Sequence, residues 1–331
     1  MKEVVCTLIT KNYGHYALVL HDSLIKQQES IHFCVFVSNG KLPHSVEVQL
    51  LSRKHVTIYY EASFKNELSI LLKEKYFTSY HDAYRWGMKS QLLIKLLNHG
   101  YERAIYVDSD IYFYNDYRFL FEELKKFSIL LSPHWRSSYP NLDMENFKLN
   151  FLDGIYNGGF IGASQGGQAA LTYWTELCLF NCEVNRSEGF YVDQRYLDIF
   201  PTRFEDVGHI THKGCNVANW NLIDCKRVLQ PDGNVLINNT EPIVFLHITN
   251  SMLKGVYLWK NDVLLQPYIE QYRDNLLKYD DVDIIVHFFE KGMHIPSRSE
   301  QHVVNPVKNS FIKQLAWFVY RTIKKLKRKL Y

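Results

Sequence analysis

The chain has 331 residues, of which 47% are hydrophobic, 22% charged and 15% aromatic, and its net charge is +3. This composition excludes a disordered chain, a collagen-like chain and a disulfide-rich miniprotein, and the length suits one large domain or two average ones. No apolar run reaches the roughly 18 residues that a membrane-spanning helix needs. The apolar N-terminus lacks a basic segment and a small-residue cleavage site, so we expect neither a transmembrane helix nor a signal peptide.

Short apolar runs alternate with helical patterns in the first third of the chain. Helices are expected at 16–24 and at 86–97, where apolar residues recur every three or four positions until His99 and Gly100. Strands are expected at 4–9, 31–37, 56–60 and 104–107. Strands that are separated by helices predict a parallel α/β sheet.

The second half of the chain is less regular. Strands are expected at 156–163, which is rich in glycine, and at 243–247, and helices at 168–180 and 267–277. No GxGxxG motif follows the first strand, and Gln168 stands where a phosphate-binding loop needs lysine. The sequence therefore predicts neither a dinucleotide-binding motif nor a P-loop.

Six cysteines lie at positions 6, 34, 178, 182, 215 and 225. The chain is large for a disulfide scaffold, and we expect no secretion signal. We therefore expect six reduced thiols and a cytoplasmic location.

Two carboxylates follow directly on the apolar strand expected at 104–107. Asp108 and Asp110 flank Ser109, and side chains two residues apart on an extended chain point to the same side. Ligands of α/β folds bind at the carboxyl edge of the sheet, and two close carboxylates repel one another there unless a proton or a cation intervenes. Because Mg²⁺ and Mn²⁺ favour such oxygen ligands, the pair predicts a metal site that can bind a diphosphate.

The tripeptide alone is a weak signal. With 17 aspartates in the chain, about one Asp-x-Asp is expected by chance. Asp281 and Asp283 form a second one, but it precedes an apolar run, so we expect a solvated turn there.

A series of longer motifs follows along the chain: Thr10–Tyr13, Trp86–Lys89, Gly100–Asp110, Tyr156–Gly162, Val192–Leu197, Gly214–Leu222 and Phe245–His247. In this order they resemble the GT-A glycosyltransferases related to family 8, over about residues 1–255. The resemblance implies the GT-A fold, which is α/β and Rossmann-like, with a mixed, mainly parallel sheet flanked by helices. It implies a glycosyltransferase domain at 1–265, a C-terminal extension at 266–307 and a basic helical tail at 308–331.

The resemblance also implies the ligands of the metal. In that family two aspartates and a later histidine hold Mn²⁺, which binds the diphosphate of the donor. Carried over to this sequence, the ligands of Mn²⁺ (or Mg²⁺) are Asp108, Asp110 and His247. The chemistry agrees, because Mn²⁺ accepts one imidazole beside carboxylates. Taken alone, a histidine that follows an apolar strand would be interpreted as structural.

Further residues of the donor site follow from the same resemblance. Thr10 and Tyr13 would touch the nucleotide base and the ribose, and Ser109 belongs to the donor-binding motif. Lys89 matches a basic residue near the donor phosphates, and the alternative is an ordinary surface lysine. Lys254 follows a segment that lacks the family's glycine-and-proline turn, so its contact with the phosphates stays open.

The residues expected to do the chemistry are Asp193, Gln194 and Asn157. The resemblance implies that Asp193 accepts hydrogen bonds from sugar hydroxyls and that Gln194 lies near the reacting carbon. The alternative for this pair is a helix that begins with Asp193 as its N-cap. Asn157 matches a polar residue between donor sugar and acceptor, with a simple turn as its alternative, and Asn216 and Asn219 would border the acceptor.

The resemblance implies a metal-dependent transferase for a hexose of UDP-glucose or UDP-galactose, acting on a glycan or glycolipid acceptor with retention, in surface polysaccharide or lipopolysaccharide synthesis. One alternative is a Mg²⁺-dependent phosphohydrolase, which is disfavoured because Ile111 follows the acidic pair and the pair does not end the first strand. A nucleotidyltransferase needs a glycine-rich basic loop that Lys11–Gly14 does not provide. An inactive binding module recruited to membranes is the third alternative.

The C-terminal segment 308–331 differs from the rest of the chain. It holds eight basic and no acidic residues, which leaves 30 basic and 35 acidic residues in the body. An acidic body is not typical of a nucleic-acid-binding protein. From Phe311 onward the apolar residues recur at helical spacing, so the segment predicts a basic amphipathic helix on an anionic membrane surface. We therefore expect a peripheral protein on the inner face of the membrane; the alternative is a tail that packs on the body.

Overall fold

The computed structural model describes residues 2–281 and 283–292. The chain divides into two compact units, Met1–Ile285 and Val286–Tyr331. The amphipathic helix expected at 308–331 lies outside the described residues. So does the part of the expected extension at 266–307 that follows α11 (Ile284–Gly292). No helix in the described part is both long and apolar enough to cross a membrane.

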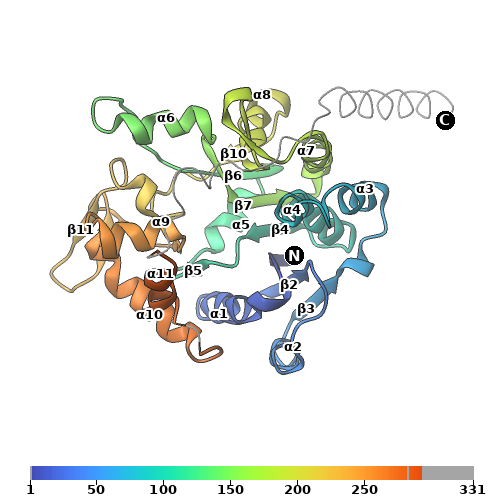
Figure 1. Ribbon diagram of the computed structural model, residues 1–331, viewed down its shortest axis with the longest axis horizontal. Helices are drawn as coiled ribbons and strands as arrows, with labels where there is room; N and C mark the ends of the chain where they lie inside the picture. Colours follow the sequence, from blue (N-terminus) through green and yellow to red (C-terminus); the bar gives the residue numbers. More distant parts are fainter. Residues whose placement is uncertain (1, 282, 293–331) are drawn as a thin grey trace. The chain divides into compact units, whose positions relative to one another are not determined.

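The first unit is organised around a seven-stranded sheet with the order β10-β6-β7-β4-β1-β2-β3 (Figure 1). β1 pairs in parallel with β2 and β4, β2 with β3, and β6 with β10, whereas β7 runs antiparallel between β4 and β6. The expected mixed, mainly parallel sheet is therefore confirmed. The strands are β1 (Glu3–Ile9), β2 (His32–Val37), β3 (Val56–Tyr60), β4 (Arg103–Val107), β6 (Ile129–Pro133), β7 (Tyr156–Ser164) and β10 (Val207–His209).

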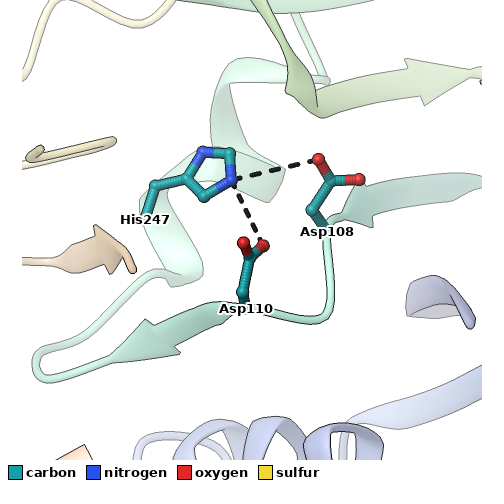
Figure 2. A group of neighbouring side chains, drawn as sticks. All are labelled: Asp108, Asp110 and His247. Atoms are coloured by element: carbon teal, nitrogen blue, oxygen red, sulfur yellow. Dashed lines mark ion pairs between the residues drawn. The ribbon is translucent and has the colours of Figure 1, made fainter. Parts of the chain in front are cut away.

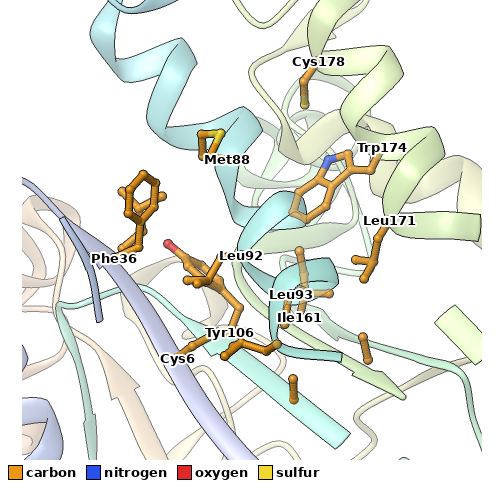
Figure 3. Packing of buried hydrophobic residues seen from close by; sticks show 14 of the residues in the cluster. Cys6, Phe36, Met88, Leu92, Leu93, Tyr106, Ile161, Leu171, Trp174 and Cys178 are labelled. Carbon is orange, nitrogen blue, oxygen red and sulfur yellow. The ribbon is translucent and has the colours of Figure 1, made fainter. Parts of the chain in front are cut away.

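Helices cover both faces of this sheet because successive strand residues point to opposite sides. Cys6 of β1 belongs to a buried cluster with Met88 and Trp174, which come from α4 and α7 (Figure 3). Its neighbour Val5 belongs to a second cluster with Leu18 of α1. The helices are α1 (Gly14–Ile25), α2 (His44–Leu51), α3 (Glu67–Tyr76), α4 (His81–Asn98), α5 (Arg118–Glu123), α6 (Met144–Leu152), α7 (Gln168–Phe180), α8 (Phe200–Arg203), α9 (Asn250–Leu253) and α10 (Gln266–Leu276).

Short antiparallel pairs lie outside the main sheet. β5 (Ile111–Phe113) pairs with β14 (Phe245–His247), and β8 (Val184–Asn185) pairs with β9 (Phe190–Tyr191). A three-stranded sheet consists of β11 (Arg227–Leu229), β12 (Val235–Ile237) and β13 (Glu241–Pro242). All six cysteines are free and buried, as expected.

The expected elements are present, with shifted ends. The helix expected at 86–97 begins earlier, at His81, and its first turn contributes Ala83 and Tyr84 to the buried core. The strand expected at 243–247 is shorter, since only Phe245–His247 pairs with another strand. The helix at 168–180 has the expected bounds.

Candidate active site

The two aspartates of the acidic motif lie in the turn between β4 and β5. β5 pairs with β14 so that Ile111 is opposite His247, and this register carries the imidazole to the acidic turn. His247 Nε2 lies 3.2 Å from Asp110 Oδ1 and 3.9 Å from Asp108 Oδ2 (Figure 2). One ligand atom of each residue lies within 4.8 Å of the others, so the three side chains can converge on one cation.

The three side chains Asp108, Asp110 and His247 do not neutralise one another's charge. Burial lowers the pKa of His247, but Asp110 and Asp108 outweigh it and raise that pKa overall. The desolvated carboxyl of Asp108 is kept ionised by Lys89 and His247, which hold its pKa below the usual value. Two carboxylates and an imidazole nitrogen are a donor set that suits Mn²⁺ better than Mg²⁺, which prefers oxygen ligands. The residues therefore fit the metal that the resemblance implies.

Lys89 of α4 connects the acidic turn to a second carboxylate. It is 5% exposed, so the alternative of an ordinary surface lysine is wrong. Its Nζ lies 3.3 Å from Asp108 Oδ1 and 3.3 Å from Asp193 Oδ2, and it donates to Gly158 O at 2.9 Å. Burial lowers the pKa of Lys89, but the two carboxylates raise it overall. This ammonium therefore stays charged and is held by three acceptors of the protein.

Asp193 is 1% exposed. Burial raises its pKa to about 6, although Lys89 acts in the opposite direction. Asp193 occupies the N-cap position of the 3₁₀ helix Gln194–Ile199, as the alternative expected, but its side chain makes no capping hydrogen bond. Among the described residues its Oδ2 has the Lys89 ion pair but no hydrogen-bond partner. An acceptor atom is thus available beside the metal ligands.

The strand β7 brings the remaining expected residues to the same place. Asn157 Nδ2 lies 3.3 Å from His247 Nδ1. This contact orients the imidazole so that its other nitrogen, Nε2, faces the two aspartates. Gln194 accepts from Gly158 N at 3.0 Å. A Cβ on Gly159 would lie 2.5 Å from His247 Cε1 and 3.0 Å from Asp108 Oδ2, so this position has no room for a side chain.

The two asparagines expected at the acceptor differ in placement. Asn216 is fully buried with a φ of +56°, and its Oδ1 accepts from Asn157 Nδ2 at 3.4 Å. Asn219 instead donates to Asn261 Oδ1 at 3.0 Å. The structure therefore brings Asn216, but not Asn219, into hydrogen-bonding contact with the site.

The expected nucleotide residues lie at the neighbouring strand end. Thr10 follows β1, which pairs with β4 in parallel, so Thr10 and Asp108 follow adjacent strands at one edge of the sheet. Tyr13 is 49% exposed, and its ring centroid is 5.2 Å from that of Tyr16. Lys254 is exposed and begins a π-helical turn, and no described ion pair or hydrogen bond joins its side chain to the site.

Several residues of the site were not expected. Tyr106 donates to Asp108 Oδ1 at 2.6 Å, and the Trp220 ring lies edge-on to His247 with centroids 5.4 Å apart. Burial, together with the nearby Tyr13 and Asp110, raises the pKa of Tyr16 to about 12. Only Tyr106 had a sequence signal, since it lies two residues before Asp108 and points to the same face.

The chain is similar to proteins of Bacillus subtilis (strain 168). It is 32% identical over 262 residues to the uncharacterized protein YfnF, a match that covers 77% of this chain and 84% of YfnF. The chain belongs to the YfnF family. The uncharacterized protein YfnD is 31% identical to this YfnF-family protein over 255 residues, covering 75% of this chain and 77% of YfnD. No protein-family model matches this chain.

Among solved structures, a galactosyltransferase, LgtC, in complex with donor and acceptor sugar analogues has the same fold. The match to this YfnF-family protein has a TM-score of 0.50 and 12% identity, and it covers 83% of this chain and 95% of LgtC. The expected GT-A fold class is thereby confirmed.

Proposed function

We propose that this YfnF-family protein is a metal-dependent glycosyltransferase related to family 8. It moves a hexose from a nucleoside diphosphate sugar, UDP-glucose or UDP-galactose, to a glycan or glycolipid acceptor. The convergence of Asp108, Asp110 and His247 at the carboxyl edge of a GT-A sheet carries this proposal. LgtC, which shares the fold, was crystallised with donor and acceptor sugar analogues, and this favours the same two ligand classes here.

The acidic turn and β14 hold the cation. Asp108, Asp110 and His247 would hold Mn²⁺ or Mg²⁺, which would supply positive charge beside the leaving diphosphate. Because the two aspartates are about one-third exposed, they are open to a ligand from solution. Thr10 and Tyr13 contact the nucleotide base and the ribose, and Ser109 belongs to the donor-binding motif.

The buried carboxylate of Asp193 binds the hexose. Among the described residues its Oδ2 faces only the Lys89 ammonium at 3.3 Å, and a sugar hydroxyl supplies a further donor to this oxygen. Lys89 keeps Asp193 and Asp108 ionised and holds them at a fixed separation, so that sugar and diphosphate bind in one orientation. Gln194 and Asn157 then lie at the reacting carbon.

We infer that the reaction retains the anomeric configuration. No further protein carboxylate is then required as a base, because an oxygen of the leaving phosphate takes the proton of the acceptor hydroxyl on the same face. Proton NMR of the product tests this, since retention gives the donor's anomer, and an inverted anomer contradicts it.

We further propose that the protein acts in surface polysaccharide or lipopolysaccharide synthesis, on the cytoplasmic face of the membrane. The basic segment 308–331 binds the anionic surface there. Deletion of 308–331 should release the protein from vesicles that contain anionic lipid. Continued co-sedimentation of the truncated chain with these vesicles would contradict a membrane role for this segment.

The transferase proposal is tested by release of UDP from UDP-glucose and UDP-galactose, with Mn²⁺ and with chelator. We expect release with Mn²⁺ only, and a loss of about 100-fold or more in Asp110→Asn, because the turn then lacks one anionic ligand. Asp116→Asn is the matched control, because Asp116 pairs only with the exposed Arg118 in the described contacts. Mg²⁺-dependent release of inorganic phosphate would instead indicate the phosphohydrolase alternative.

A further inference from the structure

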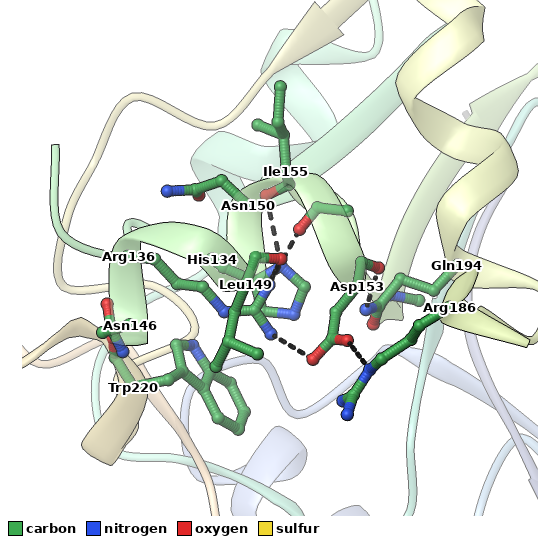
Figure 4. Close-up of polar contacts among 12 residues, drawn as sticks. His134, Arg136, Asn146, Leu149, Asn150, Asp153, Ile155, Arg186, Gln194 and Trp220 are labelled. Atoms are coloured by element: carbon green, nitrogen blue, oxygen red, sulfur yellow. Dashed lines mark hydrogen bonds and ion pairs between the residues drawn. The ribbon is translucent and has the colours of Figure 1, made fainter. Parts of the chain in front are cut away.

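A buried cluster of charges, which we call the Asp153 cluster, lies beside the site and has no part in the proposed chemistry. It consists of Arg136, Asp153 and Arg186 (Figure 4). Arg136 Nη2 lies 3.4 Å from Asp153 Oδ2, and Arg186 Nε lies 2.7 Å from Asp153 Oδ1. The Asp153 and Arg136 side chains are each 6% exposed, whereas that of Arg186 is 44% exposed. Two cations therefore converge on one buried carboxylate from two separate segments.

The cluster fixes the chain where α6 ends. The last carbonyls of a helix have no partner within it, and Arg136 Nη1 donates to two carbonyls here, Leu149 O at 2.8 Å and Gly154 O at 2.9 Å. Asp153 is the C-cap of α6, and Gly154 has a φ of +107°, a conformation that favours glycine. The guanidinium of Arg136 thus binds the last turn of the helix, its cap and the residue beyond it.

The backbone of this fixed turn holds Gln194. Asp153 O accepts from Gln194 Nε2 at 2.9 Å, while Gly158 N donates to Gln194 Oε1 at 3.0 Å. Both ends of the Gln194 side-chain amide are therefore bound to backbone groups. These two hydrogen bonds fix the position of the amide, with Nε2 facing Asp153 O and Oε1 facing Gly158 N. One of these two groups is the carbonyl of the residue that the arginines hold.

We propose that the Asp153 cluster is a positioning device for Gln194. Arg136 and Arg186 do not touch the reacting atoms; they fix Asp153, whose carbonyl orients the amide. This inference rests on the proposed function, in which Gln194 lies at the reacting carbon. A misplacement of about 1 Å can reduce a rate by up to about 100-fold, so a device that holds one amide has a measurable effect.

Arg186 is the residue to change. Loss of Asp153 would leave the buried Arg136 without its counter-ion and threaten folding, whereas Arg186 is half-exposed. Arg186→Met removes the charge and its hydrogen bond to Asp153 but retains an aliphatic chain beside Tyr191, over whose ring Arg186 lies. Arg186→Lys restores a charge, and Arg118→Met removes an exposed arginine that pairs with Asp116.

Two readouts on the full-length protein separate positioning from general destabilisation. The first is the side-chain amide resonance of Gln194, identified by its loss in Gln194→Ala. It should shift and exchange faster with solvent in Arg186→Met, recover in part in Arg186→Lys and be unchanged in Arg118→Met. An unchanged Gln194 resonance in Arg186→Met overturns the inference, whether or not any sugar donor is turned over.

The second readout is turnover of the UDP-hexose. In Arg186→Met we expect kcat for Mn²⁺-dependent UDP release to fall about tenfold, while the Kd for UDP with Mn²⁺ stays within about twofold of the wild-type value. In the Gln194→Ala background Arg186→Met should have no further effect on kcat, because the group it positions is gone. Additive effects, or equal losses in kcat and UDP affinity, contradict positioning. If the wild-type protein releases no UDP, the proposed function fails, and the amide resonance alone decides the inference.

Discussion

The two sides of the site neutralise their carboxylates in different ways. On the metal side, Asp108 and Asp110 have side chains that are 30% and 33% exposed, and they share the imidazole of His247. On the sugar side, Asp193 and Asp153 are 2% and 6% exposed and face protein cations. A buried carboxylate without a counter-ion is costly, so the closed side carries its own cations. The open side retains surplus negative charge, and this favours a cation from solution.

Lys89 connects the two sides, and its removal should have the largest effect. Lys89→Met leaves the buried Asp193 without a counter-ion, and breaking such a pair costs about 3–5 kcal/mol. We expect that loss in the free energy of unfolding measured with urea. Lys148→Met is the control, because Lys148 pairs with Glu145 on the surface and such pairs contribute less than about 1 kcal/mol. A loss below about 1 kcal/mol in Lys89→Met would contradict this account of the sugar side.

The second prediction concerns the pH dependence of the sugar side. Asp193 has a pKa of about 6 in the folded protein, above the value of about 3.9 in an unfolded chain. The folded state therefore binds this proton more tightly, so its contribution to stability is present below about pH 4 and is lost as the pH rises through about 6. The loss amounts to about 3 kcal/mol.

Metal-free protein is the material for this measurement, with Asp193→Asn as the reference. Relative to Asp193→Asn, the wild-type protein should lose about 3 kcal/mol of unfolding free energy as the pH rises from about 4 to about 7. Carboxyl ¹³C NMR should show Asp193 titrating near pH 6 and Asp108 well below it, since the pKa of Asp108 is lowered. Titration of Asp193 near pH 4 would contradict the prediction.

The smallest expected effect compares two adjacent glycines of β7 that face different sides. A Cβ on Gly159 would lie 2.5 Å from His247 Cε1, whereas a Cβ on Gly158 meets Asp193 Oδ2 at 3.3 Å. Gly159→Ala should cost about 1–3 kcal/mol of stability and weaken Mn²⁺ binding, measured by calorimetry, at least tenfold. Gly158→Ala should leave Mn²⁺ affinity nearly unchanged. Equal losses of Mn²⁺ affinity in Gly159→Ala and Gly158→Ala would contradict the division of the site into a metal side and a sugar side.

The sequence predicted the open side better than the closed side. Asp108 and Asp110 are two residues apart at the end of an apolar strand, so strand geometry placed them on one side, although the tripeptide alone is a weak signal. His247 has no such local signal, because its place depends on the register of β14 against β5. Only the resemblance to a family of glycosyltransferases pointed to it.

The closed side depends on contacts between distant segments. The resemblance drew attention to Lys89 near the donor phosphates, but the sequence could not show that its ammonium contacts Asp108, Asp193 and Gly158. The Asp153 cluster takes its residues from three segments with no common spacing, namely those of Arg136, Asp153 and Arg186. No pattern in the sequence therefore indicated that these side chains meet. Five of the seven strands of the main sheet were expected from short apolar runs, whereas β6 and β10 were missed. The helix α6 was also missed, because none of its residues is fully buried.

Calorimetric titration of UDP-glucose and UDP-galactose into the full-length protein, with and without Mn²⁺, tests the central claim most directly. We predict that at least one of them binds only when Mn²⁺ is present, and that Asp110→Ala abolishes this binding without lowering the Tm of the metal-free protein. Binding that is equal without metal, or that persists in Asp110→Ala, would contradict a donor site built on Asp108, Asp110 and His247. Failure of both sugars to bind with Mn²⁺ would contradict the transferase proposal itself.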